Sequence, residues 1–494
     1  MYSFLISMAA LVLGYLFYGK FLAGVFGADS NRTTPAISHA DGVDYVPMPA
    51  WKIYMIQFLN IAGTGPIFGA IMGAKFGPSS YLWIVLGCIF AGAVHDYLSG
   101  MASLRYGGAS LPDIIGRNLG KTTKYIVLVF SVILLLLVGA VFVYSPAQIL
   151  GDMTEGMTGS ATSSALIWGG IIFVYYLIAT LMPIDKIIGK IYPLFAFALI
   201  FMVVALMGGL LVKWPDIPEI WQGLGNRSAE LGVSGQSIFP CLFITIACGA
   251  ISGFHATQSP MMARCITNEK LGRPIFYGAM ITEGAVALVW AAVASYFFFD
   301  GGAAETGSSI SASAPQIVTA VSKSWLGVLG SILALLGVVA APITSGDTAL
   351  RSARLIIAEL LHVKQHSKAS RLAISIPIFA LVALLLWYNM ADANGFNNIW
   401  KYFGWANQTL AVFTLWALTV YLVKNKGGAY FIITLLPACF MTAVCLSFIC
   451  TQPIGFRMPQ SWTPYIAAGS GIAGLALFCA WYYGRSKKLK CTLP

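Results

Sequence analysis

The chain has 494 residues, of which 58% are hydrophobic and only 10% are charged, and its mean hydropathy is +0.80. Soluble domains carry about 25% charged residues, so this composition excludes a protein whose whole surface faces water. The formal net charge of +11 does not indicate a nucleic-acid partner, because the basic residues lie in short loops between apolar segments.

Roughly thirteen segments are long and apolar enough to span a membrane, which takes about 20 residues each. The loops between them alternate in charge: Arg105 and Arg117 mark one side, whereas Asp152 and Glu155 mark the other. Because the basic side is cytoplasmic, we expect the N-terminus outside and the C-terminus inside. The expected spans are Tyr2–Phe26, Ile53–Gly77, Tyr81–Ser103, Tyr125–Leu150, Ser164–Met182, Ile187–Val212, Ser237–Met261, Ile275–Phe299, Leu326–Leu350, Leu372–Tyr388, Ile399–Val423, Tyr430–Cys450 and Trp462–Tyr483.

Two of these spans are interrupted by glycine. The second contains NIAGTGP at Asn60–Pro66, and the seventh contains ACGAISGFH at Ala247–His255. Glycine lowers helix stability and proline removes a backbone donor. Either interruption alone also fits a glycine face for close helix packing. Two broken helices at corresponding positions, five spans apart, are typical of transporters built from inverted repeats.

The expected fold is an all-α polytopic membrane protein with a five-plus-five inverted-repeat core. It resembles the leucine-transporter type of fold in the amino acid–polyamine–organocation (APC) superfamily. We assign residues 51–236 to the first five-helix repeat and residues 237–425 to the second, inverted one. Residues 1–50 supply an additional N-terminal helix and a cytoplasmic loop, and residues 426–494 supply two C-terminal helices and a basic tail.

The ends of a broken helix provide binding groups. Amide N–H groups at a half-helix N-terminus suit a carboxylate, and exposed carbonyls suit a cation. We therefore expect the substrate to be a small carboxylate or a zwitterion such as a short peptide, while an inorganic anion fits the same chemistry. The amides of the eleventh span have helix packing or gating as their alternative role. The expected substrate-binding residues are Gly63, Thr64, Gly65, Ser252, Gly253, His255, Asn407 and Gln408.

Ionisable side chains at membrane depth are candidates for ion coupling, because they are costly to keep there. His95 and Asp96 are adjacent in the third span, and we expect each to have a different partner, since neighbouring helical side chains diverge by about 100°. Glu283 lies in the eighth span. Asp347 begins a helical run in which an ordinary ion pair with Arg351 is the alternative.

The ninth span offers a second interpretation of the coupling ion. Ala341, Thr344 and Ser345 have the spacing of sodium ligands in leucine-transporter-type proteins, where carbonyls of the first broken helix, here Ile61 and Gly63, complete the site. Hydroxyl and carbonyl oxygens suit a hard cation. The alternative is that the hydroxyls bond back to carbonyls of their own helix.

Seven short elements lie between the first loop and the eleventh span. They are DGVDYVP at Asp41–Pro47, IAGTGP at Ile61–Pro66, GAVHD at Gly92–Asp96, GASL at Gly108–Leu111, ACGAISGFH at Ala247–His255, DTALRSAR at Asp347–Arg354 and FGWANQ at Phe403–Gln408. Together they resemble the carbon starvation protein A (CstA) family. The resemblance implies uptake of pyruvate and short peptides across the bacterial inner membrane under carbon starvation, coupled to protons in preference to sodium. The chain differs from the family pattern at Thr64, where alanine is usual, and at Ile343–Asp347.

Two other classes of function are weaker alternatives. An ion channel should show a repeated selectivity element, and the two interruptions are unlike each other. An intramembrane enzyme is disfavoured because the sequence contains neither an HExxH nor a GxSxG motif. We expect no catalytic residue and no cofactor. The expected partners are a small-molecule substrate and the lipid bilayer, with the oligomeric state left open.

Overall fold

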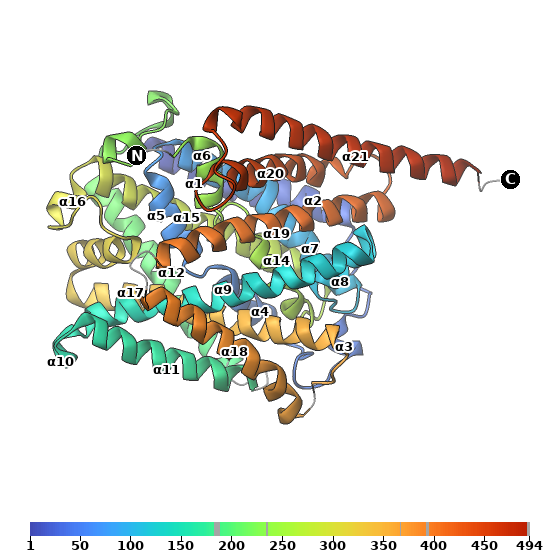
Figure 1. Ribbon diagram of the computed structural model, residues 1–494, viewed down its shortest axis with the longest axis horizontal. Coiled ribbons are helices and arrows are strands. Elements are labelled where there is room, and N and C mark those ends of the chain that lie inside the picture. The colour runs from blue at the N-terminus through green and yellow to red at the C-terminus, as the bar shows by residue number, and fades with distance from the viewer. Residues whose placement is uncertain (182–187, 234–235, 366, 392–394, 492–494) are drawn as a thin grey trace.

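The computed structural model describes residues 1–181, 188–233, 236–365, 367–391 and 395–491, and every regular element within these ranges is helical (Figure 1). Met182 and Ile187, the expected ends of two spans, lie outside the described residues. Most of the long helices follow the long axis of the molecule, and the N-terminus and the last turns of α21 lie toward its opposite ends (Figure 1).

The label η marks a 3-10 or π-helical turn. The first part of the chain forms α1 (Tyr2–Leu13), η1 (Gly14–Tyr18), α2 (Gly19–Phe26), α3 (Pro35–Ser38), α4 (Ala50–Ile61), η2 (Gly65–Gly69), α5 (Ala70–Ala74), α6 (Ser79–Gly87), η3 (Cys88–Gly92), α7 (Ala93–Arg105), α8 (Leu111–Leu119), α9 (Lys121–Met153), α10 (Glu155–Thr158), α11 (Ala161–Leu181) and α12 (Ile188–Lys213).

The rest of the chain continues in the same all-helical manner. It forms η4 (Ile220–Gln222), η5 (Ser228–Leu231), η6 (Ile238–Leu242), α13 (Phe243–Thr245), α14 (Gly253–Ala263), η7 (Glu269–Leu271), η8 (Arg273–Gly278), α15 (Ala279–Phe299), α16 (Gly302–Glu305), α17 (Ala314–Leu360), α18 (Lys368–Ala391), α19 (Gly395–Asn425), α20 (Ile432–Thr451), η9 (Gln460–Trp462) and α21 (Thr463–Cys491).

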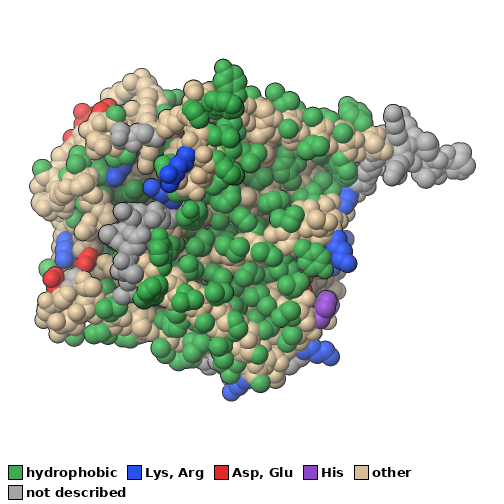
Figure 2. Space-filling model, viewed as in Figure 1, with side chains coloured by type: hydrophobic (Ala, Val, Ile, Leu, Met, Phe, Trp, Pro, Cys, Tyr) green, Lys and Arg blue, Asp and Glu red, His purple; other side chains and the backbone are tan. Residues whose placement is uncertain are grey.

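The expected multi-pass membrane architecture is confirmed. Among the described residues, eleven helices are long and apolar enough to cross a membrane, and the bent pair α4 and η2–α5 makes twelve. The remaining expected span, Ser237–Met261, is divided into η6, α13 and α14, so none of its pieces is long enough alone. Hydrophobic side chains cover the middle of the face in Figure 2, and its visible Asp and Glu side chains lie near the end that carries α10 and α16.

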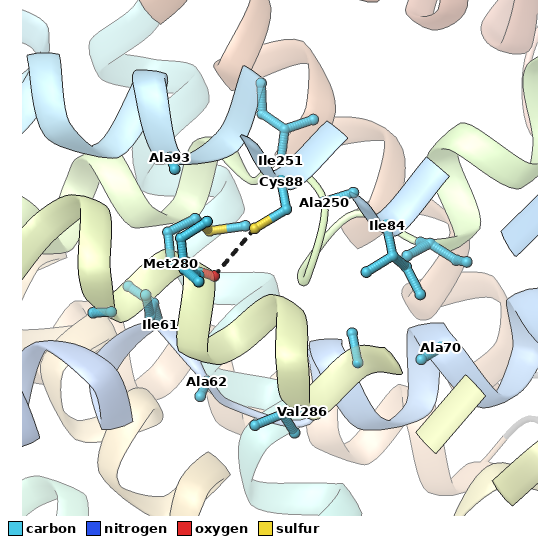
Figure 3. Packing of buried hydrophobic residues seen from close by; sticks show 14 of the residues in the cluster. Ile61, Ala62, Ala70, Ile84, Cys88, Ala93, Ala250, Ile251, Met280 and Val286 are labelled. Atoms are coloured by element: carbon cyan, nitrogen blue, oxygen red, sulfur yellow. Dashed lines mark hydrogen bonds between the residues drawn. The ribbon is translucent and has the colours of Figure 1, made fainter. Parts of the chain in front are cut away.

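The two glycine-interrupted segments meet in the core. One cluster of buried apolar residues includes Ile61 and Ala62 from the first interruption, Ala250 and Ile251 from the second, and Met280 of α15 (Figure 3). The small side chains of Ala62 and Ala250 let the backbones of the neighbouring segments approach closely. Long helices surround this region, with α17 packing against α9, α11 and α12.

Candidate functional site

The first expected interruption is present in the structure. Helix α4 ends at Ile61, Ala62 leaves the helical conformation (φ −81°, ψ 50°), and the following half of the helix is bent away by 51°. Gly63 lies at the bend, where a Cβ atom would approach the ring of Phe142 to 2.7 Å. A larger residue at this position would therefore displace the ring of Phe142.

The second expected interruption is also present. Residues 246–252 form a non-helical connection between α13 and α14. Within it, Gly249 has φ 88°, a left-handed conformation that favours glycine. At the start of α14, a Cβ on Gly253 would lie 2.4 Å from the backbone nitrogen of Ala411 and from the carbonyl oxygen of Asn407. The second half of this helix thus packs directly on the backbone of α19.

The two breaks contact each other. A Cβ on Gly65, in the first broken helix, would lie 2.3 Å from Sγ of Cys248, in the second. The thiol therefore fills the space that the missing side chain leaves. Sequence reasoning expected Gly65 at the site but not Cys248. The only available signal for Cys248 was its position inside the interrupted segment.

A chain of ionisable side chains joins three helices beside the second break. Nδ1 of His255, on α14, lies 2.9 Å from Oδ2 of Asp96 on α7, and its Nε2 lies 3.4 Å from Oε2 of Glu283 on α15. All three side chains are fully buried. Oε1 of Glu283 also accepts the backbone N–H of Gly249 at 3.1 Å. This buried triad, Asp96–His255–Glu283, is thereby attached to the break itself.

The prediction that His95 and Asp96 have separate partners is wrong. Nδ1 of His95 lies 2.8 Å from Oδ1 of Asp96, while the other oxygen of the same carboxylate contacts His255. The Cβ atoms of His95 and Asp96 point in different directions on α7. Even so, Nδ1, the ring nitrogen nearer to the backbone, reaches one of the two carboxylate oxygens of Asp96. Asp96 thus bridges two imidazoles.

Two amides of α19 hold the two halves of the second broken helix. Oδ1 of Asn407 accepts the backbone N–H of Phe254 at 2.7 Å and the hydroxyl of Ser252 at 3.1 Å. Nε2 of Gln408 donates to the carbonyl of Phe243 at 2.8 Å. Asn407 therefore caps the first turn of α14, where backbone N–H groups have no partner within the helix. These contacts fit the helix-packing alternative for both amides.

Replacing Asn407 by alanine should destabilise the protein by about 1–2 kcal/mol, because the first turn of α14 loses its cap. Thermal unfolding of the purified protein in detergent measures this loss. Asn425→Ala is the control, since the amide of Asn425 bonds only within α19, to the carbonyl of Tyr421. Equal melting temperatures for the two variants would contradict the capping role.

Three of the residues predicted for sodium, Ala341, Thr344 and Ser345, lie on α17, whereas Ile61 and Gly63 lie at the first break. Oγ of Ser345 donates to the carbonyl of Leu59 near the end of α4 at 2.7 Å, so α17 does meet the first broken helix. Oγ1 of Thr344 donates to the carbonyl of Ala341 at 2.8 Å, which is the back-bonded arrangement within its own helix. Asp347 is on the same helix, and its Oδ2 accepts the hydroxyl of Tyr192 at 3.0 Å.

The spacing in the sequence offered an ion pair between Arg351 and Asp347 as an alternative. In the structure, Arg351 contacts residues that are much further away in the sequence. Its Nη2 donates to the carbonyl of Ala179 at 2.7 Å, and its Nη1 lies 3.9 Å from Oδ1 of Asp44. The predicted ion-coupling residues thus divide into two groups. Asp96, Glu283 and His95 lie around His255, which was predicted to bind substrate, and the other predicted ion-coupling residues lie on α17.

Polar side chains along the first broken helix have no hydrogen-bond partner among the described residues. Both amide atoms of Gln57 and of Asn60 and the hydroxyl of Thr64 are in this state, and all three residues are fully buried. Gln57 and Asn60 share one face of α4, because they are three residues apart. A buried polar group without a partner costs about 1–3 kcal/mol. The first break therefore presents polar groups that are suited to a ligand.

The chain matches one protein family model and several related proteins. The family model "Carbon starvation protein CstA" matches residues 1–170, 148–324 and 301–448. An uncharacterized membrane protein of Haemophilus influenzae is 46% identical over 60% of this chain and 91% of its own length. The peptide transporter CstA of Escherichia coli is 26% identical over 91% of this chain and 80% of its own length. The pyruvate/proton symporter BtsT of Escherichia coli is 25% identical, with coverages of 94% and 84%.

Solved structures show the fold. A manganese transporter of Eremococcus coleocola, in a mutant form, superposes with a TM-score of 0.58 at 13% identity, covering 90% of this chain and 98% of that chain. The expected transporter-like, all-helical fold is thereby confirmed. The sequence elements that carried the family resemblance lie within the matched segments. The chain therefore belongs to the carbon starvation protein CstA family.

Proposed function

We propose that this chain is a proton-coupled secondary transporter that imports a small carboxylate, such as pyruvate, or short peptides across the bacterial inner membrane. The observation that carries the proposal is the buried triad Asp96–His255–Glu283, attached to the second of two broken helices that touch each other. The relatives named as a peptide transporter and as a pyruvate/proton symporter support the substrate class and the ion.

The triad has the chemistry of a proton carrier. An imidazole between two carboxylates can hold or release a proton at either ring nitrogen, and ionisable groups buried in a membrane are typical of proton relays. Glu283 contacts His255 and also accepts the N–H of Gly249. Proton transfer along the triad therefore changes the hydrogen bond that fixes the second break. His95 tunes the same carboxylate from its other oxygen.

Transport follows from alternating access around the two breaks. The repeats assigned to residues 51–236 and 237–425 move against each other about the site, with the N-terminus outside and the C-terminus inside. A bound proton shifts the equilibrium toward the conformation that binds it more tightly. The size of the shift equals the difference in proton-binding free energy between the two conformations. Thr64, Gln57 and Asn60 then supply polar side chains to the substrate. Gly65, Ser252 and Gly253 fix the geometry of the two breaks around it.

Asn60→Ala should raise the KM for substrate about tenfold, which corresponds to the loss of one hydrogen bond to a charged group. It should not lower the melting temperature, because Asn60 bonds to none of the described residues. Initial uptake rates and thermal unfolding separate the two effects. Asn407→Ala serves as the matched control, since its amide is satisfied within the protein. A loss of stability in Asn60→Ala with unchanged KM would contradict a role in binding.

Uptake into proteoliposomes tests the function. Labelled pyruvate should accumulate under an inward proton gradient without sodium, a protonophore should abolish the accumulation, and unlabelled dipeptides should compete. Uptake that requires sodium would transfer coupling to the group formed by Ile61, Gly63, Ala341, Thr344 and Ser345. Absence of uptake under either gradient would remove pyruvate as the substrate.

A further inference from the structure

A cavity lies away from the triad, where the first broken helix ends and α19 begins. Its volume is about 540 Å³, within the range of roughly 300–1,000 Å³ that is usual for small-molecule sites. Its walls come from the ends of α5, α19 and α20 and from η6 and α13. We refer to this cavity as the vestibule.

The vestibule is lined by two lysines, Lys75 and Lys401, and by no carboxylate among the described lining residues. Neither lysine has an acidic partner within 4.0 Å in the described part of the chain. Arg227, close to this region, lies 2.8 Å from Glu230 and packs its stem against Gly77, two residues beyond Lys75. The two lysines of the vestibule differ from it, since no carboxylate of the described residues lies within that distance of either.

The vestibule leads toward the second break along one face of α19. Lys401, Gly404 and Gln408 follow at spacings of three and four residues, so they lie on the same side of that helix. Gln408 holds the carbonyl of Phe243, and its position is about 10 Å further along the helix axis than Lys401. Thr245, the last residue of α13 before the break, lines the floor of the vestibule.

We propose that the vestibule attracts carboxylate anions and delivers them to the second broken helix. Two lysines in a concave, partly apolar space raise the local concentration of anions. A dipeptide with no net charge gains little from them, so the vestibule favours a monocarboxylate over a neutral peptide. That the attracted anion is the transported substrate rests on the proposed function. The positive potential of the vestibule is independent of that function.

Cysteine modification measures that potential without any transport. Gln236→Cys places a thiol at an exposed position of the vestibule, and Ser309→Cys places one on an exposed loop outside it. The purified proteins are treated at low salt with anionic sulfonatoethyl or cationic trimethylammonioethyl methanethiosulfonate, and the rates of the chain without the added cysteine are subtracted. Lys75→Gln with Lys401→Gln should lower the anionic-to-cationic rate ratio at position 236 at least about fivefold, because each lysine attracts the anionic reagent and repels the cationic one.

At position 309 the ratio should not change, and at high salt the difference at position 236 should disappear, because counter-ions screen the lysines. An unchanged ratio at position 236 at low salt would overturn the proposal. This result is independent of pyruvate uptake, so a failure of the proposed transport function remains distinguishable.

Uptake kinetics then test the route. The double glutamine variant should raise the KM for pyruvate several-fold without changing the maximal rate, and it should leave uptake of dialanine unchanged. Arginine at both positions should restore the KM, and Lys323→Gln, at an exposed lysine outside the vestibule, should have no effect. A modification ratio that falls while the KM for pyruvate stays the same would overturn the role in substrate delivery.

Discussion

His255→Gln should abolish proton-driven accumulation of substrate, with the initial rate falling at least about 100-fold, in line with the loss of a positioned proton carrier. Glutamine approaches histidine in size and can still donate to Asp96, but it cannot take up a proton between the two carboxylates. Initial uptake of labelled pyruvate into proteoliposomes under an inward proton gradient measures the effect.

His39→Gln is the matched control, because His39 is exposed and bonds only to the neighbouring Ser38. It should retain the rate of the unsubstituted protein. His95→Gln should have an intermediate effect, since His95 contacts only one oxygen of Asp96 and not Glu283. Protonophore-sensitive accumulation at the normal rate in His255→Gln would contradict the role of the triad.

Gly253→Ala should lower both the stability and the transport activity of the protein. The added Cβ would meet backbone atoms of Ala411 and Asn407 at 2.4 Å, and neither can move without separating α14 from α19. Overpacking of this kind costs about 1–3 kcal/mol. It also shifts the cap that Asn407 provides. We expect a lower melting temperature together with lost uptake.

The control for this change is Gly208→Ala in α12, where a new Cβ would meet nothing within 4 Å. Alanine favours a helix over glycine by about 0.5–1 kcal/mol, so Gly208→Ala should be as stable as the original protein or more stable. If Gly253→Ala unfolded and transported like Gly208→Ala, the close packing of the second break would not be required.

The spans and both breaks were predictable because their signals are local. Twenty apolar residues identify a span wherever it packs, and the predicted segment Ile275–Phe299 ends at the same residue as α15. Glycine and proline in Asn60–Pro66 act on their own backbone, so the end of α4 at Ile61 needs no tertiary information. The predicted span Ser237–Met261 matches no single helix, since the structure divides this segment into η6, α13 and α14.

The contacts at the site were not predictable from spacing alone. The partners of His255 come from α7 and α15, and which side chains meet depends on how three helices rotate as they pack. The same holds for Cys248 against Gly65. Adjacent residues can mislead as well: the helical geometry that separates the Cβ atoms of His95 and Asp96 did not exclude a contact between their polar ends.

Substrate-driven proton influx tests the central claim most directly. Proteoliposomes with a pH indicator inside and no initial proton gradient receive pyruvate on the outside, and internal acidification is followed over time. The account predicts acidification with the unsubstituted protein and none with His255→Gln. Pyruvate uptake without acidification, or acidification that persists in His255→Gln, would contradict it.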